Sequence, residues 1–308
     1  MNKNIIENHL KQINLLNTLD INNIYILANI ILNCKGNIFL TGVGKNTSIA
    51  KYMSDIMKSI GLPSFYFCTL NCTHGDMGVI KNDDILIYLS KSGNTEELVN
   101  VAKVLYEKNI VSILISSSII SELNKFTTHQ LIIPIDNELT FMIPSTSTIS
   151  YIFIFNILIN VLVYKKELTL KLYGENHPGG SIGYLLNTKV KDIMIKDNLP
   201  IIKNNITLKQ SIIKMTEFKQ SFILYVENEL LLGIFTDGDL RRILNNNYNL
   251  EEKIKNLINK NVLYFNEDEL INNIIENYKN SSFLDSGIPI LDSNKKIKGI
   301  INKSVLFK

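Results

Sequence analysis

Five short apolar runs alternate with helix-like segments in the first half of the chain, and this alternation restricts the fold more than any other feature. The runs are residues 38–40, 64–67, 85–89, 112–115 and 131–133. Segments with helical periodicity separate most of them, notably residues 48–60 and 95–108. Strands that are apolar throughout and alternate with helices are typical of a parallel sheet covered on both faces. The sequence therefore predicts an α/β domain with a doubly wound parallel sheet.

Two further apolar segments flank these runs. Residues 4–33 carry apolar side chains at spacings of three and four, which predicts one or two amphipathic helices. Residues 151–164 form the most apolar run but contain Asn156 and Asn160. As a helix this run would span about 21 Å, against roughly 30 Å for a bilayer core. We therefore expect a buried helix and no membrane partner.

Composition narrows the cellular setting and the class of ligand. The 308 residues are 45% hydrophobic and 20% charged, enough for two compact domains. The formal net charge of +3 is spread along the chain, so we expect no nucleic-acid partner, whereas an anionic small molecule is compatible. The 3 cysteines are too few for a disulfide framework, and the chain start lacks a signal-peptide layout. Both features predict a cytoplasmic protein.

A weak internal repeat begins at residue 190, with an offset of roughly 65 residues. Residues 191–194 correspond to 255–258, and the paired runs at 222–225 and 233–235 correspond to 288–291 and 299–301. A copy of about 55 residues is only marginally stable by itself, so the two copies are expected to pack together. We place the first domain at residues 1–186 and the second at 190–308, with copies at 190–248 and 254–308.

Two polar loops follow predicted strands and precede predicted helices. They read Thr41-Gly42-Val43-Gly44-Lys45-Asn46-Thr47-Ser48 and Ser90-Lys91-Ser92-Gly93-Asn94-Thr95-Glu96-Glu97-Leu98. Backbone N–H groups in such loops can approach an anion. The first loop lacks the glycine pattern of a dinucleotide site, because Thr47 stands at the third glycine position, and it lacks that of a P-loop, because Phe39 stands at the first. A plain glycine turn or a hydroxyl-rich helix cap explains each loop alone, but the pair together favours a phosphate ester.

Two of the 4 histidines lie in glycine-containing loops, His74 before Gly75 and His177 before Pro178. A loop histidine can serve as an acid or base because its pKa lies near neutrality, although a structural role is equally compatible. His9 and His129 fit surface or capping roles. Cys68, Cys72 and His74 could begin a metal site, but no second ligand pair of the usual spacing follows. We therefore expect no metal.

Six motifs, in this order, resemble those of the arabinose-5-phosphate isomerase family, in which a sugar isomerase (SIS) domain precedes a pair of cystathionine-β-synthase (CBS) domains. They lie at residues 41–45, 73–78, 90–98, 144–148, 176–183 and 233–242. The resemblance covers nearly the whole chain. It implies a flavodoxin-like three-layer sandwich followed by a tandem CBS pair.

The resemblance also implies an activity and a set of catalytic residues. The family interconverts D-ribulose 5-phosphate and D-arabinose 5-phosphate through an enediol, toward the Kdo of lipopolysaccharide, and needs no cofactor. Its catalytic positions correspond to Lys45, His74, Glu97 and His177. We hypothesise that Glu97, rather than the neighbouring Glu96, removes the C–H proton. His177 would assist proton transfer and ring opening, His74 would polarise the carbonyl or hydroxyls, and Lys45 would stabilise negative charge.

Substrate-binding and nucleotide-binding positions follow from the same resemblance. The substrate-binding residues would be Gly42, Gly44, Thr47, Ser48, Gly75, Ser90, Ser92, Gly93, Thr95, Ser145, Thr146 and Ser147. In the first CBS copy, Thr236 and Asp239 keep the pattern that contacts a ribose, whereas the second copy has Asn302 and Val305. At most one nucleotide site is therefore expected, and a purely structural pair is an equal alternative.

Two departures from the family pattern affect the expected substrate site. Asn46 and Thr47 stand where the family usually has Ser-Gly, which predicts a looser or differently shaped phosphate loop. The segment 138–144 is short and lacks the Cys and His often found there, so substrate contacts from it are not expected to follow the family pattern.

The resemblance also implies an oligomeric state, and two alternatives to the expected activity remain open. SIS domains generally pair with a second copy, so we expect a homotetramer built as a dimer of dimers through the first helix and the 151–164 helix. The alternatives to the expected activity are an isomerase for another phosphosugar, such as a hexulose 6-phosphate, and a non-catalytic phosphosugar sensor. The presence of all four catalytic residue types favours an enzyme.

Overall fold

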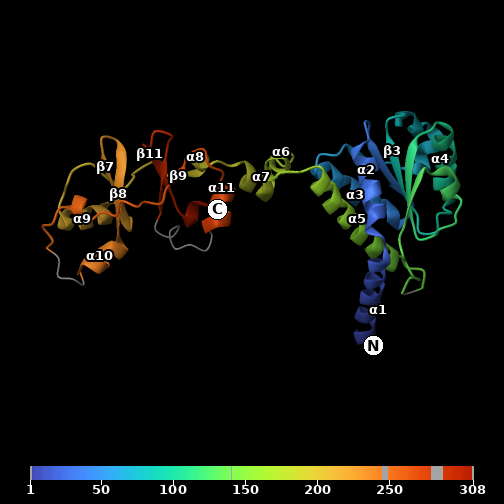
Figure 1. Ribbon diagram of the computed structural model, residues 1–308, viewed down its shortest axis with the longest axis horizontal. Helices are drawn as coiled ribbons and strands as arrows, with labels where there is room; N and C mark the ends of the chain where they lie inside the picture. The colour runs from blue at the N-terminus through green and yellow to red at the C-terminus, as the bar shows by residue number, and fades with distance from the viewer. Residues whose placement is uncertain (1, 140, 245–248, 279–286, 307–308) are drawn as a thin grey trace. The chain divides into compact units, whose positions relative to one another are not determined.

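The computed structural model describes residues 2–139, 141–244, 249–278 and 287–306, and it divides into two compact units (Figure 1). The first unit is Met1–Asn176 and the second is His177–Lys308. The expected end points of the two repeat copies, at 248 and 308, lie outside the described residues. Because the two units are separate bodies, each is described by itself.

The first unit contains a five-stranded parallel sheet with the strand order β2-β1-β3-β4-β5. Its strands are β1 (Ile38–Gly42), β2 (Ser64–Tyr66), β3 (Ile85–Leu89), β4 (Val111–Ser116) and β5 (His129–Ile132). Each of the five apolar runs contains or overlaps one strand, so the predicted parallel sheet is confirmed. This order is the flavodoxin-like one, in which ligands bind beyond the carboxyl ends of the strands near β1 and β3.

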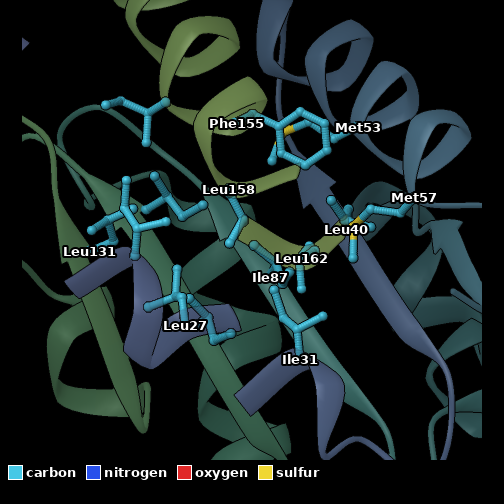
Figure 2. Close-up of a cluster of buried hydrophobic side chains, with 14 of the residues drawn as sticks. Leu27, Ile31, Leu40, Met53, Met57, Ile87, Leu131, Phe155, Leu158 and Leu162 are labelled. Carbon is cyan, nitrogen blue, oxygen red and sulfur yellow. The ribbon is translucent and has the colours of Figure 1, made fainter. Parts of the chain in front are cut away.

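Helices cover both faces of this sheet, which explains why the strands are apolar on both sides. On one face, Leu40 and Ile87 pack against α2 (Ile21–Leu32), α3 (Lys45–Ser59) and α5 (Thr146–Lys165), in the cluster shown in Figure 2. On the other face, Phe39 and Leu86 pack against α4 (Glu96–Glu107). Successive strand residues therefore enter opposite cores, as the period of two requires. The predicted three-layer sandwich is confirmed.

The most apolar helix, α5, is a core element of the first unit. It is the one helix, among the described residues, that is long and apolar enough by itself to cross a membrane, and half of its most apolar window is buried. Tyr151, Phe155 and Leu162 are among its buried side chains. Contacts with α2 and α3 account for this burial. The expected buried helix is confirmed, and it begins earlier than residue 151.

Further helices complete the first unit and lead into the second. Those of the first unit are α1 (Asn2–Leu15), η1 (Leu16–Thr18), η2 (Thr69–His74), η3 (Asp76–Val79), η4 (Leu123–Phe126) and α6 (Leu170–Glu175). The second unit opens with α7 (Gly180–Asn187) and α8 (Val190–Ile193). Its helix α7 contacts α11 (Ile271–Tyr278) of the same unit.

The second unit consists of two similar halves, which confirms the predicted repeat. One half has the sheet β6 (Ile201–Ile202), β7 (Phe222–Glu227) and β8 (Leu230–Thr236), with α9 (Leu208–Phe218) and α10 (Asp237–Leu244). The other has β9 (Phe265–Asn266), β10 (Ile288–Leu291) and β11 (Ile297–Ile301), with α11 and α13 (Lys303–Leu306). In each half a short strand pairs parallel to the middle strand, and a hairpin supplies the antiparallel pair.

The two halves exchange their first segments. Val190 and Met194, which precede the first half in sequence, lie in the hydrophobic core of the second half. Ile254, in η5 (Ile254–Asn256) at the start of the second half, lies in the core of the first. Each half therefore uses a segment of the other to fill its core, which explains physically why such small copies are stable as a pair.

Candidate active site

Four loops of the first unit leave the sheet at its carboxyl edge, because all five strands run parallel. These loops follow β1, β2, β3 and β5, and they lead into the helices that carry Lys45, His74, Glu97 and Ser147 respectively. Gly42 at the end of β1 pairs in register with Leu89 at the end of β3. The two polar loops found in the sequence therefore begin side by side, at the position where this strand order opens a crevice.

The loop after β1 places Lys45 at the first position of α3. Gly44 precedes it as the N-cap residue with a φ of 63°, a left-handed conformation that favours glycine. Asn46 Nδ2 donates to the carbonyl of Leu89 at 3.1 Å, and Thr47 Oγ1 donates to the carbonyl of Gly42 at 2.9 Å. The residues that depart from the family pattern thus tie this turn to β1 and β3. Lys45 is exposed.

The loop after β3 is held by its own hydroxyl groups. Ser90 Oγ lies 3.0 Å from Thr95 Oγ1 and accepts a hydrogen bond from the N–H of Gly93 at 3.1 Å. Ser92 Oγ accepts from the N–H of Asn94 at 3.2 Å. Gly93 has a φ of 67°, and a Cβ there would lie 2.2 Å from Ser121 Oγ, so a side chain would not fit. This packing fixes the turn that precedes α4.

The carboxylate of Glu138 lies at the start of α5, among the residues that were expected to bind substrate. Its Oε2 accepts hydrogen bonds from the backbone N–H groups of Ser145 at 2.9 Å, Thr146 at 2.8 Å and Ser147 at 3.4 Å. Its Oε1 lies 3.0 Å from Lys91 Nζ. Burial acts to raise the pKa of Glu138, but the hydrogen bonds from Ser147, Ser145 and Lys91 outweigh it and lower the pKa to about 2.

A cavity of about 480 Å³ opens between these loops, within the size range of small-molecule sites. It is lined by Val43, Lys45, Asn46, Lys91, Asn137, Glu138, Phe141, Met142, Pro144 and Ser147. Two ammonium groups and one carboxylate therefore share one cavity. Sequence reasoning missed Glu138 and Lys91. The signal available was an acid ahead of the hydroxyl-rich start of α5, and a lysine inside the Ser-Lys-Ser-Gly loop.

The other expected catalytic residues lie elsewhere in the described structure. His74 ends η2, Glu97 is the second residue of α4, and both are exposed. Neither is among the described residues that line the cavity of Lys45. His177 belongs to the second unit, where its carbonyl oxygen accepts a hydrogen bond from Asn187 Nδ2 at 3.1 Å. The structure thus brings together Lys45 and Ser147 from the expected set.

The remaining expected substrate residues differ in accessibility. Gly42, Gly93, Thr146 and Ser147 are buried, whereas Gly44, Ser48, Gly75 and Ser92 are exposed. The hydroxyls of Ser145 and Thr146 are buried without a hydrogen-bond partner among the described residues. The three N–H groups at the start of α5 already bind the Glu138 carboxylate, so in the described part of the chain these two hydroxyls are the groups there that remain free for a ligand.

The cysteine and histidine motif has no metal-site geometry. Cys72 is buried, its Sγ lies 3.3 Å from the carbonyl oxygen of Cys68, and burial raises the pKa of its thiol to about 12. A thiol held protonated is a poor metal ligand because binding requires the thiolate. Among the described residues, no group of three or more His, Cys, Asp or Glu gathers as a metal site would require.

The second unit has a cavity of about 720 Å³ at the turn between β8 and α10. Thr236, Asp239 and Arg242 line it, together with Tyr278 and Pro289. Asp239 Oδ2 accepts from the N–H of Thr236 at 2.9 Å and from its hydroxyl at 2.7 Å, and Asp239 Oδ1 pairs with Arg242.

The matching turn of the second half is different. Asn302 Oδ1 accepts from the N–H of Val305 at 3.2 Å, and the Val305 side chain is buried in the core of that half. The carboxylate of the first half therefore has an apolar counterpart in the second.

Comparison with known proteins agrees with this architecture. Residues 31–159 match the SIS domain, and residues 190–246 and 254–308 each match the CBS domain. The chain is 30% identical over 278 residues to the arabinose 5-phosphate isomerase KdsD of Francisella tularensis, covering 89% of this chain and 84% of that protein. It is 33% identical over 221 residues to the arabinose 5-phosphate isomerase KpsF of Escherichia coli, covering 71% and 67%.

A solved structure is similar to the SIS part. It is a protein of Escherichia coli CFT073 in complex with arabinose 5-phosphate, which is 26% identical with a TM-score of 0.54, covering 57% of this chain and 95% of that one. The chain therefore belongs to the arabinose 5-phosphate isomerase family, as a sugar-phosphate isomerase with a SIS domain followed by a CBS pair.

Proposed function

We propose that this protein, in the cytoplasm, interconverts D-ribulose 5-phosphate and D-arabinose 5-phosphate through an enediol intermediate, and so supplies the sugar phosphate for biosynthesis of the Kdo of lipopolysaccharide. The observation that carries the proposal is the cavity at the carboxyl edge of the sheet, where Lys45 and Lys91 present two ammonium groups. Such a cavity suits a phosphate ester. The relatives named for this reaction, which align over most of the chain, support the choice of sugar.

The proposed chemistry moves one proton between adjacent carbons of the sugar. Glu97 removes the C–H proton, and His177 assists proton transfer and ring opening. His74 polarises the carbonyl or hydroxyl groups, while Lys45 stabilises the negative charge of the enediolate or the phosphate. The hydroxyls of Ser90, Ser92, Thr95 and Ser145–Ser147, with the backbone of the glycine turns, hold the phosphate. No cofactor takes part in this mechanism.

A homotetramer, built as a dimer of dimers, is part of the proposal. In one chain His74 and Glu97 lie outside the cavity that Lys45 lines, so a neighbouring copy is needed to complete the site. The first helix offers an apolar surface for this contact, since Ile6 is 65% and Leu10 54% exposed. Sedimentation should detect a tetramer, and a fully active monomer would contradict this part of the proposal.

The cavity beside Thr236 and Asp239 is the proposed site of one nucleotide for each chain. A volume of about 720 Å³ is sufficient for a nucleotide, and a carboxylate at this turn can accept hydrogen bonds from ribose hydroxyls. Because Val305 replaces the carboxylate in the other half, the proposal includes a single site.

The test of the catalytic proposal is a direct assay of the purified chain with D-ribulose 5-phosphate in D2O. We expect D-arabinose 5-phosphate that carries deuterium from the solvent at C2, because an enediol exchanges its proton. Turnover of a hexulose 6-phosphate alone would instead identify an isomerase for another phosphosugar. Binding of ribulose 5-phosphate without any turnover would identify a sensor.

A further inference from the structure

The main chain at Lys91 is fixed to the sheet more firmly than that of an ordinary loop residue. Its carbonyl oxygen accepts hydrogen bonds from Ser116 Oγ at 3.0 Å, Ser117 N–H at 3.1 Å and Ser117 Oγ at 2.9 Å. All three donors lie at or just beyond the end of β4. The side chain of Lys91 therefore starts from a defined point at the carboxyl edge, inside the loop that carries Ser90 and Ser92.

The ammonium group of Lys91 is held at the wall of the cavity with one donor left over. Nζ donates to Glu138 Oε1 at 3.0 Å and to the carbonyl oxygen of Asp136 at 3.1 Å. A lysine has three N–H donors, so the contacts with described residues use two of them. The side chain is 33% exposed and lines the same cavity as Lys45. A ligand in this cavity can therefore reach the third donor.

The charge balance of the cavity favours an anion beside Lys91. The Glu138 carboxylate already accepts three backbone N–H groups at the start of α5, which compensate much of its charge without any lysine. Lys45 has no ion pair with any other described residue. The cavity thus holds two positive groups and one largely compensated carboxylate, whereas a phosphate ester carries a charge of about −1.5 to −2.

We propose that Lys91 binds the phosphate group of the substrate directly, as a second cation in the cavity that Lys45 lines, and so helps to select phosphorylated sugars. This inference rests on the proposed function for the identity of the sugar, but it concerns the phosphate group alone. A phosphate contact is equally strong in the ground state and the transition state, so its loss raises KM and leaves kcat nearly unchanged.

The test compares K91M and K91Q with the wild-type tetramer. We expect KM for ribulose 5-phosphate to rise about 10- to 100-fold, as for a lost charged hydrogen bond, with kcat changed less than about threefold. The inhibition constant of inorganic phosphate should rise in parallel, and K91R should recover most of the affinity. K125M is the matched control, because Lys125 forms an ion pair with Glu122 away from the cavity and its loss should leave KM unchanged.

Several outcomes would overturn the inference. One is an unchanged KM and phosphate inhibition constant in both neutral variants. Another is a fall in kcat and melting temperature with unchanged phosphate affinity, which would show that Lys91 only positions Glu138. If the wild-type protein isomerises no sugar, the proposed function fails, and calorimetric titration with inorganic phosphate still tests Lys91. Equal binding of phosphate by wild type and a folded K91Q would then refute the inference.

Discussion

Each unit of the protein places one carboxylate beside a cation near the start of a helix. The two carboxylates differ in how far away in the sequence their partners lie. Glu138 reaches forward to the N–H groups of residues 145–147, and its cation, Lys91, lies 47 positions earlier in the chain. Asp239 makes its contacts with Thr236 and Arg242, each three residues away. The first arrangement joins distant segments of the fold, whereas the second is complete within the seven residues 236–242.

The charges around the two carboxylates differ as well. The cavity of Glu138 contains a further cation, Lys45, and this excess of positive charge suits an anionic reactant. At the other carboxylate, Arg242 already balances Asp239. We therefore interpret the first as part of a reaction site and the second as part of a ligand-binding site that performs no chemistry.

The largest expected effect tests the proposed base Glu97, which in one chain lies outside the cavity of Glu138. Replacing Glu97 by Gln removes the proposed base, so turnover should fall by about 10²- to 10⁴-fold while substrate binding is retained. The neighbouring E96Q is a matched control, because Glu96 is exposed on the same first turn of α4 and should leave kcat unchanged. Initial rates and calorimetric titration with arabinose 5-phosphate measure both effects. Full turnover by E97Q would remove Glu97 from the mechanism.

The same contrast explains what the sequence could and could not predict. The strands were predictable because each is an apolar run with turn residues on both sides. The Thr236 and Asp239 turn was identified through the resemblance to CBS domains, whose pattern lies within four consecutive residues. The role of Glu138 was not visible, since it depends on a loop that returns to the start of α5 and on a lysine from the loop after β3. Periodicity gives no information about such contacts. The placement of His74 and Glu97 relative to the cavity likewise depends on tertiary structure.

Glu138 should also contribute to stability in a way that depends on pH. Its pKa is about 2 in the folded chain against an ordinary value of 4.5, so the carboxylate stabilises the fold above about pH 4.5 and loses this effect as the pH falls toward 2. E138Q should therefore cost about 2 to 3 kcal/mol at pH 7.

Thermal unfolding at pH 7 and pH 3 measures this difference, which should shrink at the lower pH. The control is E122Q, since Glu122 pairs with Lys125 on the surface and should contribute little. A melting temperature of E138Q equal to that of wild type at pH 7 would show that the α5 start needs no carboxylate.

The smallest expected effect concerns the second unit and tests whether its cavity is a binding site. An adenosine nucleotide should bind once per chain, and D239A should weaken this binding about tenfold, because the ribose loses a charged hydrogen-bond acceptor. The matched control is N302A, which changes the corresponding turn of the other half, where Val305 is packed in the core. Neither variant should alter isomerase kcat. Calorimetric titration with AMP and ATP measures the affinity, and equal weakening by both variants would contradict a single site at Asp239.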